Sequence, residues 1–97
     1  MRKLLLVDDD TYSQKMLEDI FRKEWKIINE TSMEAISKRL SNETFNLILL
    51  NASIRRNDGE MMFDGIYSLA PDTPIVTYTN IANVRVGRAL LKKGAFW

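Results

Sequence analysis

The sequence contains no cysteine and no histidine. The absence of cysteine excludes disulfides, thiolate zinc sites and cysteine nucleophiles, and the absence of histidine removes the usual neutral-pH base and the commonest metal ligand. A strong charge of one sign is also missing, because 14 basic residues stand against 13 acidic ones. This balance gives no indication of a nucleic-acid or membrane surface as partner, so any partner must be recognised locally.

Long apolar runs are missing as well. Residues 4–7 form the first strongly apolar run, which is far shorter than the core of a signal peptide or a membrane-spanning helix and favours a cytoplasmic protein. Two prolines and four glycines are too few for a disordered or collagen-like chain. With 97 residues, of which 45% are hydrophobic, we expect a single globular domain over residues 1–97, which excludes a two-domain enzyme.

Short apolar runs alternate along the chain with longer amphipathic stretches, a pattern typical of an α/β protein. The runs bounded by polar residues predict parallel strands that are buried on both faces. Strands are predicted at residues 4–7, 25–29, 45–50 and 75–79, and helices at about 11–24, 33–40, 63–69 and 82–93.

Capping signals mark the helix starts. Asp10 or Thr11 is predicted to cap the first helix, and Thr31 followed by Glu34 fits a capping box at the second. Gly94 is in the position of a C-cap after the last helix. Residues 53–59 are predicted to form a polar loop that ends in a turn at 57–59.

Apolar residues in the first helix recur at helical spacing. Tyr12, Met16, Ile20 and Phe21 follow this spacing together with Trp25. We expect them to face the core, with Tyr12 and Trp25 as core or core-edge residues.

Acidic residues gather where the first predicted strand ends. Asp8, Asp9 and Asp10 follow that strand directly, and Asn51 follows the third strand. Right-handed crossovers favour a doubly wound sheet, whose crevice lies outside the carboxyl ends of the strands. We therefore expect the acids and Asn51 to face one crevice.

Five short segments together resemble the receiver domain of bacterial two-component response regulators, and the resemblance covers nearly the whole chain. It implies a flavodoxin-like fold of strand order 2-1-3-4-5, an acidic pair that holds Mg²⁺, and an aspartate after strand three that accepts a phosphoryl group. The segments are Val7-Asp8-Asp9, Leu49-Leu50-Asn51, Asn57-Asp58-Gly59, residues 74–79 and Lys93-Gly94-Ala95.

The resemblance assigns roles to individual positions. Asp8 and Asp9 correspond to the metal-binding pair, and Asn51 corresponds to the phosphoacceptor. Asp58-Gly59 corresponds to the loop after strand three, and Thr79 to the switch hydroxyl. For Thr79, ordinary strand propensity is an equally good explanation.

The sequence departs from the family pattern in three places. Asn51 has no ionised form that could become an acyl phosphate, so we expect no aspartyl phosphorylation there. Arg55 occupies a position where many relatives have proline, which loosens the backbone and places a cation near the acids. The chain stops at residues 94–97, where strand five should begin, so we expect a sheet of order 2-1-3-4 without strand five, helix five and the family lysine.

The acidic cluster has two interpretations. Asp8 and Asp9, with the Asn51 side-chain oxygen and a loop carbonyl, could hold Mg²⁺, and we expect this binding to be weak because one carboxylate is lost. Alternatively, the acids only cap the first helix and stay solvated.

The expected partner is another protein, either a histidine kinase or an output protein. Exposed basic positions on the last helix are candidates for that contact, although a solvated helix face is the somewhat better explanation for any one of them. We also expect self-association through the edge of strand four or the C-terminal end. The basic candidates are Arg85, Arg88, Lys92 and Lys93.

These observations favour a non-enzymatic signalling module that acts by binding protein. One alternative keeps a phosphoryl or ligand site near Asp8 and Asp9, or on Ser53. A less favoured alternative is a small haloacid-dehalogenase-like phosphotransferase with Asp8 as nucleophile and Asp10 as acid or base, for which 97 residues are too few. A dinucleotide site is disfavoured, because no G-x-G-x-x-G follows the first strand.

Overall fold

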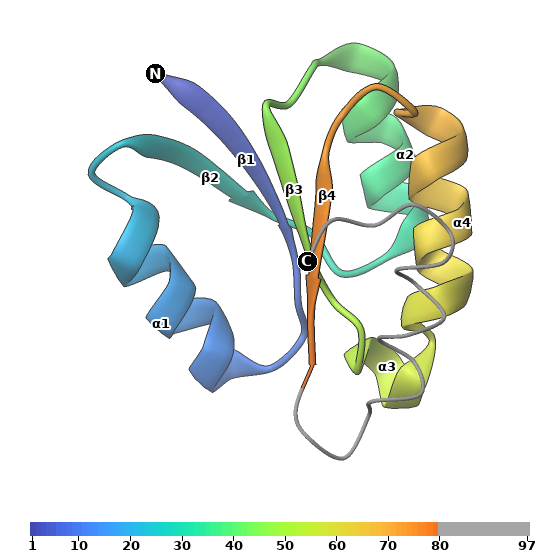
Figure 1. The fold of residues 1–97 in the computed structure, drawn as a ribbon, viewed down its shortest axis with the longest axis horizontal. Coiled ribbons are helices and arrows are strands. Elements are labelled where there is room, and N and C mark those ends of the chain that lie inside the picture. Colours follow the sequence, from blue (N-terminus) through green and yellow to red (C-terminus); the bar gives the residue numbers. More distant parts are fainter. Residues whose placement is uncertain (80–97) are drawn as a thin grey trace.

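The computed structural model describes residues 1–79, apart from the side chains of residues 56 and 57. Strands and helices alternate along this part of the chain (Figure 1). The elements are β1 (Arg2–Val7), α1 (Thr11–Phe21), β2 (Trp25–Asn29), α2 (Met33–Asn42), β3 (Leu47–Asn51), α3 (Ile54–Asn57), α4 (Gly59–Leu69) and β4 (Ile75–Tyr78).

The four strands form one parallel sheet in the order β2-β1-β3-β4, which confirms the predicted topology. Figure 1 shows α1 on one face of the sheet and α2 and α4 on the other. The carboxyl ends of the strands therefore meet at the same edge of the sheet, where the strand order reverses between β1 and β3.

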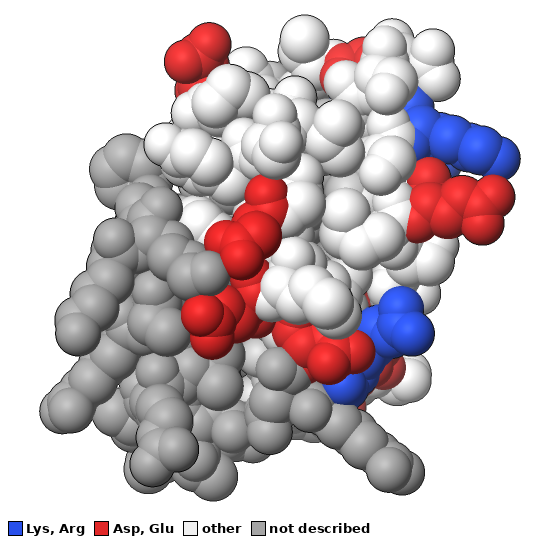
Figure 2. All heavy atoms as spheres, turned by 90° about the vertical axis from the view of Figure 1, so that its right-hand side faces the viewer, with Lys and Arg blue, Asp and Glu red and all other residues white. Residues whose placement is uncertain are grey.

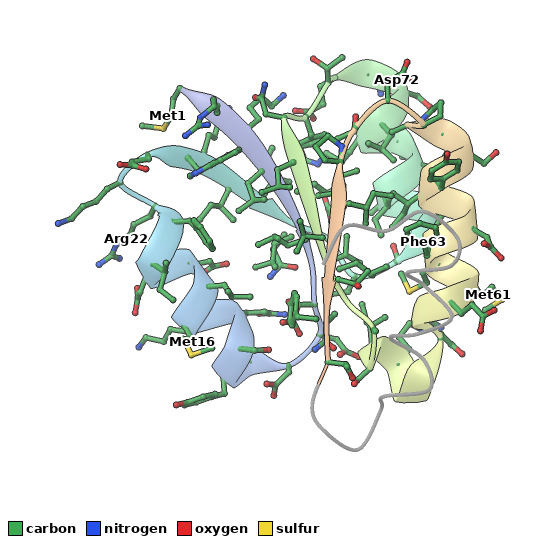
Figure 3. The ribbon with its side chains drawn as sticks, viewed as in Figure 1. Met1, Met16, Arg22, Met61, Phe63 and Asp72 are labelled. Carbon is green, nitrogen blue, oxygen red and sulfur yellow. The ribbon has the colours of Figure 1, made fainter. Side chains whose placement is uncertain are left out.

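Each face of the sheet carries its own apolar layer. Leu5 and Ile48 point to the α2 and α4 side and pack with residues such as Phe63, which reaches from α4 toward the sheet (Figure 3). Leu4 and Leu6 point to the other side, where Leu17 and Phe21 of α1 cover them. Successive side chains of a strand alternate between faces, so one continuous aliphatic run supplies both layers.

Several element ends differ from the predicted ones. β1 begins at Arg2 rather than Leu4, because Arg2 and Lys3 extend the ladder to Trp25 and Lys26. β3 begins at Leu47 rather than 45, α1 ends at Phe21 rather than 24, and β4 ends at Tyr78 rather than 79. The ends of strands and helices depend on backbone hydrogen bonds, and the position of an apolar run in the sequence does not predict where these hydrogen bonds stop.

The capping residue of α1 was predicted as Asp10 or Thr11, and the structure selects Asp10, whose Oδ2 accepts a hydrogen bond from Ser13 N at 3.1 Å. The capping box predicted at Thr31 is wrong. Ser32 is the N-cap of α2, and its hydroxyl accepts a hydrogen bond from Ala35 N at 3.2 Å. Two adjacent hydroxyl residues compete for one position here, so the sequence alone was ambiguous.

The polar loop predicted over residues 53–59 is also wrong. Residues Ile54–Asn57 form the short helix α3, which ends where Asp58 N donates to the Ile54 carbonyl at 2.9 Å. Ile54 is completely buried. This one apolar side chain fixes the segment on the core and allows a helical turn between polar neighbours.

The predicted core face of α1 is only partly correct. Tyr12, Met16 and Ile20 are 77%, 45% and 62% exposed, and Figure 3 shows Met16 pointing away from the sheet. The prediction is confirmed for Phe21, which faces the sheet together with Leu17, a residue four positions earlier that was not predicted. Both sets have helical spacing, so periodicity could not choose between them.

Trp25 packs against the α1-side layer as expected, with the Arg2 guanidinium 4.2 Å from its ring centroid. The predicted helix at 82–93, the Gly94 cap and the basic candidates at positions 85, 88, 92 and 93 lie outside the described residues. Within residues 1–79, no helix has the length and apolar character needed to cross a membrane.

Candidate functional site: an acidic pocket at the strand ends

The carboxyl ends of β1, β3 and β4 converge at the lower end of the sheet in Figure 1. The register brings them together, because Val7 pairs with Leu50, and Asn51 pairs with Tyr78. The space beyond these ends is a cavity of about 320 Å³. It is lined by Asp9, Asp10, Ser13, Asn51, Ser53, Tyr78 and Thr79.

Asp8 lies beneath this cavity with its side chain completely buried. Its Oδ1 accepts hydrogen bonds from Asp10 N at 2.8 Å and from Asn51 Nδ2 at 3.1 Å. Its Oδ2 accepts from Ser13 Oγ at 2.6 Å and from the Tyr78 hydroxyl at 2.5 Å. An ionised carboxylate has about four acceptor positions, so all of those on Asp8 are in use.

Asn51 is 9% exposed and is engaged at both ends of its amide. While Nδ2 donates to Asp8, Oδ1 accepts a hydrogen bond from Ser53 N at 2.8 Å. This network fixes the orientation of the amide, because the opposite orientation would place two acceptors together and two donors together. The oxygen of Asn51 therefore points to the loop after β3.

Tyr78 is a member of the site that the sequence analysis did not single out. Burial raises the pKa of its hydroxyl well above the ordinary value, and the hydrogen bond to Asp8 raises it further. The hydroxyl therefore stays protonated and remains a donor. Its position at the end of β4, directly before Thr79, was the only available signal.

Ser13 was missed for a similar reason. It lies one turn into α1, where it faces back toward the end of β1, and its hydroxyl donates to Asp8. Gln14 Nε2 also donates to the Asp8 carbonyl. The first turn of α1 thus encloses Asp8 from above.

Asp9 lies at the rim, where its Oδ2 accepts a hydrogen bond from Arg55 N at 3.0 Å. The Arg55 guanidinium lies 4.0 Å from Asp58. The backbone of Arg55 has φ 49°, which proline cannot adopt. A proline at position 55 could neither adopt this φ nor supply the N–H that Arg55 donates to Asp9.

Asp58 and Gly59 form the junction between α3 and α4 and do not line the cavity. A Cβ on Gly59 would lie 2.3 Å from the Ala52 carbonyl oxygen. Glycine is required here by the close approach of α4 to the end of β3.

Thr79 follows β4, and its hydroxyl lies 2.8 Å from Ser53 Oγ. Together with the backbone hydrogen bond from Ala52 N to the Tyr78 carbonyl, this contact ties the end of β4 to the loop after β3. The structure brings Asp9, Asp10 and Asn51 to one pocket, with Asp8 hydrogen-bonded to Asn51, as expected of the acids and Asn51. Thr79 lines the same pocket.

These side chains do not form a ready-made cation site. Asp8 has no acceptor position left, and the Asn51 side-chain oxygen already accepts from Ser53 N. In the part of the chain that the structure describes, no three carboxylate side chains are grouped so that they could hold a metal ion. The residues at the strand ends therefore do not fit Mg²⁺ as they stand.

The fold is that of a doubly wound α/β protein with an acidic pocket at the carboxyl edge of its sheet. Comparison with protein-family models identifies the family. The model of the response regulator receiver domain matches residues 4–97, and the chain belongs to this family. No curated protein matches the sequence.

Solved structures with the same fold include several receivers. The N-terminal receiver domain of a Bacteroides fragilis response regulator is 23% identical, with TM-score 0.89 over 98% of this chain and 79% of that chain. The receiver domain of a Pseudomonas aeruginosa sensor histidine kinase, with magnesium coordinated in its active-site cleft, is 18% identical, with TM-score 0.81 over 97% and 80%. A Burkholderia pseudomallei response regulator with a phosphorylated aspartic acid and a calcium ion is 20% identical, with TM-score 0.80 over 98% and 56%.

Proposed function

We propose that this receiver domain signals through contact with other proteins and does not take up a phosphoryl group at residue 51. The observation that carries the proposal is the Asn51 amide, which donates to Asp8 at 3.1 Å and accepts from Ser53 N at 2.8 Å. An amide has no anionic oxygen that can attack phosphorus. Its single oxygen is also directed to the loop.

Phosphoryl uptake distinguishes this proposal from an ordinary receiver. The wild type, Asn51→Asp and the surface control Asn42→Asp should be incubated with acetyl phosphate and Mg²⁺ and their intact masses measured. We expect an added mass of about 80 Da, lost in mild base, only in Asn51→Asp. Base-labile uptake by wild type would contradict the proposal, and uptake by none would locate a second defect outside position 51.

A relocated phosphoryl site is the second candidate function. It would use Ser53, whose hydroxyl lies 2.8 Å from that of Thr79 beside the pocket. A base-stable phosphate on Ser53 in the same mass experiment would support it. A haloacid-dehalogenase-like reaction is disfavoured further, because the Asp8 oxygens already accept four hydrogen bonds and are not free to attack. Turnover of a generic aryl phosphate would revive that alternative.

Receiver domains interact with histidine kinases and output proteins, and the contact surface of this one is a proposal. We keep Arg85, Arg88, Lys92 and Lys93 as candidates for an acidic partner surface, acting in the cytoplasm. The surface formed by α4 has the opposite character, since its sequence contains Glu60 and Asp64 and no basic residue, and Figure 2 shows acidic side chains on this face.

The proposed function includes only weak binding of divalent cations. The Pseudomonas aeruginosa receiver domain holds magnesium in its active-site cleft, and the structure of the Burkholderia pseudomallei regulator contains a calcium ion. Here a cation at Asp8 and Asp9 must compete with hydrogen bonds that the protein already makes. We therefore expect any binding by this domain to be weak.

A further inference from the structure

Within residues 1–79, the buried carboxylate of Asp8 is compensated by hydrogen bonds and not by an ion pair. Its side chain is completely buried, and no lysine or arginine among the described residues forms an ion pair with it. Burying an ionised carboxylate is costly unless its oxygens are hydrogen-bonded. The four donors at 2.5–3.1 Å meet this requirement.

We infer that side-chain donors from Ser13, Asn51 and Tyr78 replace a divalent cation at Asp8, and that the Tyr78 hydroxyl is the donor that keeps the cation out. The acidic pocket is therefore complete without metal. This inference concerns cation binding and goes beyond the proposed loss of phosphoryl uptake at Asn51.

The position of Tyr78 explains how a residue on β4 can reach Asp8. In the sheet order, β3 lies between β1 and β4, and Asn51 of β3 is the backbone partner of Tyr78. The Tyr78 ring packs against the α1-side layer, and its hydroxyl donates to Asp8 at the end of β1.

The donors oppose a cation in two ways. First, Mg²⁺ needs an oxygen lone pair of Asp8, and each of these lone pairs faces an N–H or O–H group. Second, Asn51 presents its N–H group toward Asp8, where a metal-binding site would need a further oxygen ligand. Removing one donor frees a lone pair and leaves the buried charge less compensated, and both changes favour the cation.

The test is Mg²⁺ binding to the full 97-residue chain, measured by titration calorimetry and by the NMR shifts of the Asn51 side-chain amide. The variants are Tyr78→Phe and Ser13→Ala, each of which removes one donor to Oδ2. Tyr67→Phe on α4 is the matched control, because Tyr67 is 44% exposed and contacts Phe63 rather than the pocket.

We expect wild type and Tyr67→Phe to half-saturate only above about 1 mM Mg²⁺, in the range of weak cation sites. Tyr78→Phe and Ser13→Ala should bind about ten- to a hundredfold more tightly, the factor that corresponds to one hydrogen bond to a charged group. The Asn51 amide protons should shift on saturation in both variants.

Equal affinity in all four proteins, or weaker binding in both pocket variants, would overturn the inference. Ser13→Ala keeps the test available if Tyr78→Phe does not fold, because it acts on the same oxygen from another element. Both variants retain Asn51, so their cation affinity is read separately from phosphoryl uptake, and either proposal can fail without the other.

Discussion

At the scale of single residues, the hydrogen bonding of the pocket depends on whether residue 51 carries a nitrogen or an oxygen toward Asp8. Asn51 and an aspartate have nearly the same shape, yet the amide nitrogen turns an acceptor into a donor toward Asp8. Two carboxylates at this separation would repel each other, whereas the amide and the carboxylate form a hydrogen bond. Under the proposed function, an amide at this position therefore provides no phosphoacceptor and also lessens the need for a cation.

Gly59 gives a prediction at the same scale. A Cβ at this position would lie 2.3 Å from the Ala52 carbonyl oxygen, so Gly59→Ala must push α4 away from the end of β3. We expect a loss of about 1–3 kcal/mol in the free energy of unfolding, measured by urea denaturation.

Gly65→Ala is the matched control for this prediction. Its Cβ would meet the end of the flexible Met33 side chain at 2.8 Å, and alanine is the better helix residue. We expect no loss of stability there. Equal losses in the two variants would show that the Ala52 contact is not what requires glycine at position 59.

At the scale of elements, the N-caps of α1 and α2 were predictable to within one residue, whereas α4 begins at Gly59 rather than at the predicted residue 63. Asp10 was correctly placed among two candidates, while the hydroxyl of Ser32, rather than that of Thr31, caps α2. Ser32→Ala should therefore lower the free energy of unfolding by about 1 kcal/mol, and Thr31→Ala should leave it nearly unchanged. Urea denaturation of the two variants checks this, and the reverse order would show that Thr31 is the cap in solution.

The elements that the sequence predicted well are those whose signal is local. The continuous aliphatic runs of β1 and β3 predicted the existence of these strands. Their order in the sheet was predicted from the resemblance to receiver domains, and the structure has that order. The short helix α3 was missed because one buried residue, Ile54, fixes it against the core. The orientation of α1 was missed because two apolar faces have the same spacing.

In the pocket, too, the residues with a local sequence signal were predicted and those without one were not. Asp8, Asp9 and Asn51 were found because strand ends place them together. Tyr78 and Ser13 were not found, because their contacts with Asp8 span 70 and 5 residues of sequence and depend on side-chain reach. No pattern in the sequence reports such a contact.

At the scale of the whole molecule, the described surface favours self-association. Tyr12, Met16 and Ile20 form an exposed apolar stripe along α1. Exposed apolar patches commonly pair with another chain. We expect light scattering at micromolar concentration to give a mass above the 11.3 kDa of the monomer.

Met16→Lys tests the contribution of the stripe, and Met61→Lys is its control, because Met61 is an exposed methionine on α4, away from the stripe. We expect the first to reduce association and the second to leave it unchanged. A wild-type protein that stays at 11.3 kDa would contradict this prediction.

The central claim is that residue 51 cannot receive a phosphoryl group, and the intact mass of the unaltered protein after treatment with acetyl phosphate and Mg²⁺ tests it most directly. We predict that this mass stays the same while that of Asn51→Asp rises by about 80 Da. A base-labile gain in the unaltered protein that maps to the peptide containing Asn51 would contradict the account.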